Sequence, residues 1–133
     1  MRNLTKNFKK IGKNVIVNTT PHPISFLKGD ETIIVDTDAE CILNAKATEK
    51  PVSEIFVTTE FVGTAEGNAL IDEIEEWFNS NYTSAENLVI VGSIIAAQAY
   101  KGRVVAMTPA KGYERVAPAE KRMSPEKFTI FLK

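Results

Sequence analysis

Cysteine and histidine are almost missing from this sequence, in which Cys41 and His22 are the single residues of their kinds among 133. One cysteine excludes a disulfide within the chain, and it also excludes a zinc site built on several thiolates. One histidine excludes metal centres that need two or more imidazoles, including those of most metal-dependent nucleases. We therefore expect no metal, no cofactor and no catalytic group, and we expect Cys41 to be a buried, inert thiol.

Long apolar runs are missing as well. No segment has enough consecutive apolar residues to span a bilayer, so we expect no membrane partner. The basic start M-R-N-L-T-K-N-F-K-K is followed by no apolar core, which a secretory signal requires. These absences predict a cytoplasmic protein, located in the host cytoplasm if its source is viral.

Charge is nearly balanced over the whole chain but uneven along it. The net charge is −1, yet both ends of the chain are basic and residues 14–100 are acidic. The two basic ends either form one face that attracts an anion or belong to a mixed, solvated surface. Non-specific nucleic-acid binding needs a clear basic excess, so the net charge argues against a nucleic-acid partner.

Length and apolar patterning predict one domain of the α+β class. A hydrophobic fraction of 44% and a charged fraction of 25% are typical of a globular protein of this size. Dense β-branching predicts buried strands, Gly29-Asp30 between two apolar runs predicts a hairpin, and apolar residues at helical spacing after Thr64 predict a helix. We expect a mostly antiparallel or mixed sheet of six to eight short strands with two helices. The predicted strands cover 14–18, 24–27, 32–35, 41–44, 55–62, 88–91, 103–107 and 127–132, and the predicted helices cover 66–80 and 93–101.

Residues 1–13 are predicted to form a basic N-terminal arm in front of the domain, which covers 14–133. Leu4, Phe8 and Ile11 have helical spacing among five basic residues. This pattern fits either a short amphipathic helix or a loosely docked segment, because about three turns are marginal in isolation.

Three stretches of the sequence together resemble one known family. They are V-I-V-N-T-T-P-H-P-I at 15–24, V-I-V-G-S-I-I-A-A-Q-A at 89–99 and G-R-V-V-A-M-T-P at 102–109. They are similar to a family of small, functionally uncharacterised proteins that is common in phages and prophages. Its members carry a V-N-L-T-P-H-x-I strand motif and an I-V-S-x-L-V-A strand-to-helix junction, with an arginine and a proline shortly after it. The resemblance implies a phage accessory protein of about this size, and it implies no settled activity.

The chain departs from the family pattern at several positions. Threonine replaces leucine at Thr19, and Gly92 is inserted before the serine of the junction. Val104 and Val105 stand where acidic residues usually follow the arginine. The basic segment 1–13 and the lysine-rich tail are additions.

Seven residues are candidates for a site that binds a small anionic ligand. His22, beside the hydroxyl of Thr20, is either a general base or anion donor, or a structural residue at a strand exit. Ser93 opens a helix directly after a strand, where it either helps to hold an anion or only caps the helix. Lys111, Tyr113 and Arg115 suit a planar anion such as a nucleotide, with Arg103 in support, although an exposed turn explains them equally.

These residues lead to one main hypothesis and three alternatives. We expect a non-enzymatic accessory binding protein that neutralises a host factor, either by covering a protein surface or by sequestering a small nucleotide-derived signal. The alternatives are a nucleotide or phosphoester hydrolase that uses His22, a nucleic-acid-binding module, and a component of particle assembly. We also expect a homo-oligomer, because a small domain can build a larger pocket at a symmetric interface.

Overall fold

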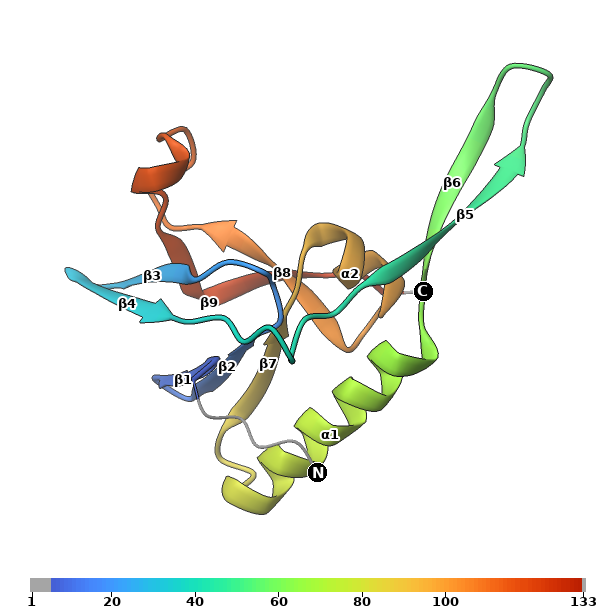
Figure 1. The fold of residues 1–133 in the computed structure, drawn as a ribbon. Helices are drawn as coiled ribbons and strands as arrows, with labels where there is room; N and C mark the ends of the chain where they lie inside the picture. Colours follow the sequence, from blue (N-terminus) through green and yellow to red (C-terminus); the bar gives the residue numbers. More distant parts are fainter. Residues whose placement is uncertain (1–5, 133) are drawn as a thin grey trace.

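The computed structural model describes residues 6–132, which form a single α+β domain with two α-helices (Figure 1). A seven-stranded mixed sheet has the order β1-β2-β7-β8-β9-β3-β4, and a separate two-stranded sheet pairs β5 with β6. The predicted fold class is therefore confirmed. The strands are β1 Phe8–Ile11, β2 Asn14–Asn18, β3 Ile24–Lys28, β4 Glu31–Val35, β5 Ala45–Pro51, β6 Val57–Gly63, β7 Asn87–Val91, β8 Val104–Pro109 and β9 Met123–Ile130, and the helices are α1 Ala65–Asn81, α2 Ile94–Ala99 and the 3₁₀ turn Pro118–Glu120.

Strand β2 lies at the centre of the packing, as its β-branched residues predict. Val15, Ile16 and Val17 have no exposed surface, because both faces of this strand are covered. It pairs in parallel with β7 on one side and antiparallel with β1 on the other. Val17 belongs to the core beneath the two helices, whereas Ile16 belongs to a second core on the other face of the sheet.

The sheet is strongly curved, so that its two edge strands face the same interior. Ile11 of β1 and Val35 of β4 belong to one core cluster although β1 and β4 lie at opposite ends of the strand order. Two side-chain amides of β2 bridge this interior. Asn14 donates to the carbonyl of Pro125 at 2.9 Å, and Asn18 Nδ2 lies 3.2 Å from the carbonyl oxygen of Val35. The second core is thus enclosed by the sheet itself.

Both helices cover the other face of the sheet and begin at the predicted caps. The Thr64 side chain accepts from the backbone N–H of Gly67 at 2.9 Å, and the Ser93 side chain accepts from that of Ala96 at 3.1 Å. Helix α1 buries its predicted apolar stripe, and Gly102 follows α2 with a positive φ of 79°. No helix among residues 6–132 is long and apolar enough to cross a membrane.

Three local predictions are wrong. Residues 8–11 form β1 and are neither a short helix nor a loosely docked segment, because their backbone pairs with β2 and the ring of Phe8 packs edge-on against that of Trp77 of α1, with ring centroids 4.7 Å apart. Residues 41–44 are irregular chain whose Cys41 and Leu43 fill the core, so their apolar side chains reflect loop packing and not a strand. The third error is the omission of β5, which pairs along its whole length with β6. Residues 1–5 of the predicted N-terminal arm lie outside the described part.

Candidate functional site

The P-H-P segment after β2 is a structural corner. Thr20 is buried, and its hydroxyl lies 2.6 Å from Asn18 Oδ1 and 2.9 Å from the carbonyl oxygen of His22, so it donates to one of them. The Thr20 carbonyl in turn accepts from the Thr37 hydroxyl at 2.5 Å. The His22 imidazole is exposed and hydrogen-bonds to no group among residues 6–132. The structure therefore uses the backbone of His22 and the side chain of Thr20 to hold the chain as it leaves the sheet.

The Gly92-Ser93 junction is explained by packing and capping. A Cβ on Gly92 would lie 2.7 Å from Val104 and 3.0 Å from Ala96, so only glycine lets β7, β8 and α2 approach this closely. Ser93 is exposed, and its hydroxyl oxygen accepts the N–H of Ala96. An anion-binding loop would lie at this strand-to-helix junction, but here Gly92 allows close packing and Ser93 caps α2.

Arg103 is held by two carboxylates of α1. Its Nη2 donates to Asp72 at 2.6 Å and to Glu75 at 2.9 Å, and these hydrogen bonds, Asp72 first, raise the pKa of the guanidinium above its ordinary value. A cation already bound by two acidic groups contributes little to the recognition of an anionic ligand. The position predicted to support a ligand instead joins α1 to the start of β8.

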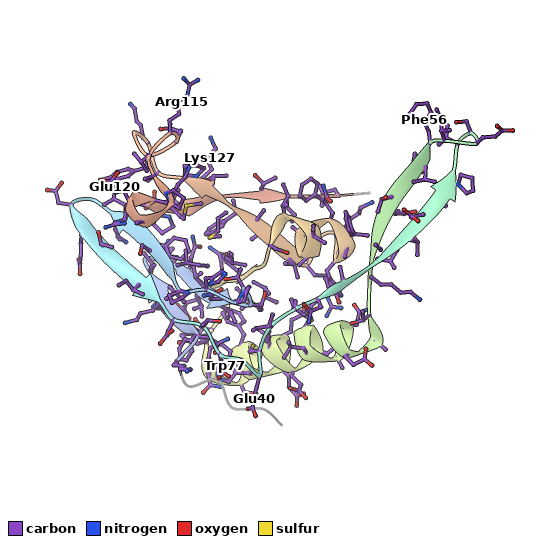
Figure 2. The ribbon with its side chains drawn as sticks, turned by 45° about the horizontal axis from the view of Figure 1, so that its top comes forward. Glu40, Phe56, Trp77, Arg115, Glu120 and Lys127 are labelled. Carbon is purple, nitrogen blue, oxygen red and sulfur yellow. The ribbon has the colours of Figure 1, made fainter. Side chains whose placement is uncertain are left out.

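Lys111, Tyr113 and Arg115 lie on the loop between β8 and β9, whereas Ser93 precedes α2 and Arg103 lies at the other end of β8. Lys111 and Arg115 are exposed and line different shallow hollows, of about 230 Å³ and 560 Å³. Figure 2 shows Arg115 pointing away from the body of the molecule. Glu114 neighbours Arg115 in the larger hollow, and its carboxylate accepts the backbone N–H of Gly112 at 2.8 Å. The structure does not bring the seven candidates into one site.

The most distinctive surface feature is a hairpin arm formed by β5 and β6, residues 45–63, which projects away from the body (Figure 1). Its two strands pair in full register from Ala45–Gly63 to Pro51–Val57. Nearly every residue of the outer half is exposed on both faces. Large apolar side chains gather at its end, residues 52–57, which we call the arm tip: Val52, Ile55, Phe56 and Val57 lie there together with the acidic Glu54, and Ile55 is 81% and Phe56 62% exposed.

The base of the hairpin arm is fixed to the body by Tyr100, at the end of α2. The buried Tyr100 hydroxyl donates to the carbonyl of Asn44 at 2.6 Å and accepts from the backbone N–H of Thr64 at 3.0 Å. A Cβ on Gly63 would lie 2.5 Å from the Tyr100 ring, so the ring fills the space that this glycine leaves. These contacts clamp both strands where they enter and leave the body. The arm tip is thus presented on a defined base.

A hollow of about 360 Å³ lies where the hairpin arm meets the body, and we call it the base hollow. Apolar side chains of Phe61, Phe131 and Leu132 share it with the polar groups of Thr59, Glu60, Gln98 and Lys101. Glu60 has an ion-pair partner on the arm, since Lys50 Nζ lies 3.8 Å from its carboxylate. Lys101 is exposed at the end of α2. The base hollow is therefore lined by apolar side chains together with one basic and one acidic group, Lys101 and Glu60.

One feature of the sequence indicates the arm tip, but a search for catalytic or ligand-binding residue types does not find it. V-S-E-I-F-V at 52–57 contains four large apolar residues between two stretches of polar composition. This cluster has neither the period of a helix nor the alternation of a strand, because it spans a turn. No sequence pattern predicts the role of Tyr100, because its hydrogen-bond partners Thr64 and Asn44 are 36 and 56 positions away along the chain.

No site can be assigned from a cluster of metal-binding side chains among residues 6–132 or from similarity to known proteins. Among residues 6–132 no three His, Cys, Asp or Glu side chains are grouped as a metal site, and Cys41 is buried as predicted. Comparison of the chain with models of protein families, with curated proteins and with solved structures finds no match.

Proposed function

We propose that this chain is a non-enzymatic binding protein that acts by contact with another protein, and that the arm tip is its contact surface. The observation that carries the proposal is the cluster of exposed apolar side chains on an extended hairpin, with Ile55 81% and Phe56 62% exposed. Exposed apolar groups that gather on one feature mark an interaction site, whereas scattered ones do not. The resemblance implies a phage accessory protein with no settled activity, and the hypothesis that it neutralises a host factor by covering a protein surface requires an exposed contact element of this kind.

Contact with a protein is better supported than the capture of a small nucleotide-derived signal. A pocket for a small molecule needs a few polar groups that converge on one cavity. Of the polar candidates, Arg103 is paired with carboxylates, Thr20 is buried in a backbone network, and Lys111 and Arg115 line separate hollows. A hydrolase that uses His22 has no support from this geometry either, because the imidazole is exposed and hydrogen-bonded to no described group.

A role in particle assembly is a second candidate, favoured by the same observation. A projecting hairpin with an apolar end can join one subunit to the next, and a hairpin is often the element exchanged between subunits. The partner would then be a structural protein, and the arm tip would still be the surface that meets it.

Site-specific photo-crosslinking in a bacterial host tests the proposal. A photoreactive phenylalanine analogue placed at Phe56 should crosslink to protein on irradiation, and the same analogue at Arg115 should give little product. Arg115 is the matched control because it is also exposed but lies on a different loop (Figure 2). If the Phe56 position gives no protein adduct above the Arg115 level, the arm tip is not a contact surface and the proposal is wrong.

A further inference from the structure

We infer that the partner of the arm tip is a second copy of this chain, with the tip of each arm seated in the base hollow of the other. This inference rests on the proposed function, and it names the partner of the same surface. It follows from the state of the hairpin arm, from the chemistry of the base hollow, and from the position of the two on one chain.

The hairpin arm is incomplete as a free element. A two-stranded hairpin is marginally stable in water on its own, and it becomes stable when further strands or a packing surface are added. In this arm the outer residues are exposed on both faces, and β5 and β6 each have one edge with no strand paired to it among the described residues. A second arm beside the first would supply an apolar packing surface for the tip and a strand that pairs with one free edge.

The base hollow has the chemistry that the arm tip needs. The tip presents Ile55 and Phe56 with the acidic Glu54 directly before them. The hollow is lined by Phe61, Phe131 and Leu132 and by the basic Lys101, while its one carboxylate, Glu60, lies 3.8 Å from Lys50 Nζ of the arm. In the inferred dimer, Ile55 and Phe56 of one copy contact the apolar side chains of the other copy's hollow, and Glu54 lies near Lys101. Such complementarity selects one partner and one orientation.

The positions of tip and hollow on one chain produce a closed dimer. The tip lies at the far end of the projecting arm (Figure 1), and it contributes no residue to the hollow, which is lined by Thr59, Glu60 and Phe61 of β6 and by residues of the body. Two arms that run antiparallel place each tip over the base of the other. The same two surfaces then meet twice around one twofold axis, which is the commonest way for a homo-oligomer to close.

The native mass of the full chain in solution tests the inference. Sedimentation velocity over a wide concentration range should show a species of twice the chain mass, and Phe56→Asp should shift it to the monomer. Ile34→Asp is the matched control, since Ile34 is 56% exposed but lies on β4 of the curved sheet. It should leave the dimer intact. Circular dichroism confirms that each variant is folded before its mass is read.

Exchange of charge distinguishes a second copy from any other partner. Glu54→Lys alone and Lys101→Glu alone should each weaken the dimer, and the double variant should restore it, because both charges of the same contact are reversed together. A dimer that is indifferent to Phe56→Asp, or a double variant no better than the singles, overturns the inference.

The proposed function stands or falls separately. If the chain is monomeric at every concentration but the Phe56 crosslink joins it to a different protein, the second copy is wrong and the contact surface is right. If the crosslink is also missing, both are wrong.

Discussion

Strand β2 is enclosed on both faces, whereas β5 and β6 of the hairpin arm meet solvent on both. All three are short extended segments, and their difference lies in where the stabilising contacts come from. β2 is held by two cores of this chain, while the hydrogen bonds that join the arm to the body among residues 6–132 are at its base, with Tyr100. The comparison shows that β2 is stabilised by side chains packed on both of its faces, whereas the outer half of the hairpin arm has few packing contacts among the described residues.

The largest test of this comparison sets two phenylalanines against each other. Phe26 on β3 is fully buried and Phe56 at the arm tip is largely exposed. Phe26→Ala should lower the free energy of unfolding by about 3–5 kcal/mol, because it removes buried contacts and leaves a cavity. Phe56→Ala should change it by less than about 0.5 kcal/mol in the monomer. Denaturant unfolding at low protein concentration measures both, and equal losses would show that the arm belongs to the cooperative core.

Tyr100 tests the junction between the two regions. Tyr100→Phe removes a hydroxyl that donates to Asn44 and accepts from Thr64, and it should cost about 1–2 kcal/mol. The loss should be local, so hydrogen exchange should become faster in residues 45–63 and remain unchanged in β2. Faster exchange throughout the sheet would mean that Tyr100 supports the core and not the base of the arm.

Arg103 tests whether a surface ion-pair network contributes to the body. Arg103→Gln should cost about 0.2–1 kcal/mol, because the side chain and its partners Asp72 and Glu75 are all partly exposed to water. Added salt should reduce the difference from the wild type, since salt screens such pairs. Thermal unfolding at low and high salt measures it. A large loss that salt does not change would point to packing by the arginine stem instead.

Glu86, before β7, should give the smallest effect, and the effect should appear only in acid. Hydrogen bonds from the backbone N–H and the hydroxyl of Thr83 lower the pKa of Glu86 below its ordinary value of 4.5. Because the folded pKa is the lower one, the carboxylate stabilises the fold above about pH 4.5, and this contribution is lost as the pH falls through the folded pKa. Glu86→Gln should therefore give a flatter stability profile below pH 4.5. An unchanged acid profile would show that the Thr83 contacts do not favour the charged form.

The enclosed half of the fold could be predicted from the sequence because its signals are local. The β-branched run at 14–18 became β2, the stripe after Thr64 became α1, and Gly29, with a φ of 61°, turns the hairpin between β3 and β4. Most of these predictions depend on the spacing of apolar residues, which indicates which side chains of a helix or strand are buried. The caps Thr64 and Ser93 were predictable for the same reason, since they act within one helical turn.

The first strand of the hairpin arm and the edge strand β1 were missed because their partner strands decide their structure, whereas β6 was predicted as a strand at 55–62. A-K-A-T-E-K-P at 45–51 has low strand propensity and no buried face, so its extended form comes from pairing with β6. F-K-K-I at 8–11 became β1 because β2 offered a free edge, which the helical spacing of Phe8 and Ile11 did not reveal. The surroundings of one candidate residue could not be predicted for a related reason. Side-chain chemistry suggested Arg103 as support for an anion site, and its partners Asp72 and Glu75 lie on α1, far from it in the sequence.

The side-chain amide of Asn18 joins β2 to the end of β4 across the interior of the curved sheet, so this contact depends on the C–N bond of that amide remaining intact. Its Nδ2 lies 2.8–3.2 Å from three backbone carbonyl oxygens, of His22, Val35 and Asp36, and it has no exposed surface. Hydrolysis of that amide would leave a carboxylate oxygen facing those three oxygens, a repulsion that no rotation relieves because its neighbours are fixed. The same burial keeps water and backbone motion away from the amide. The folded chain thereby protects from chemical ageing the group on which its folded shape relies.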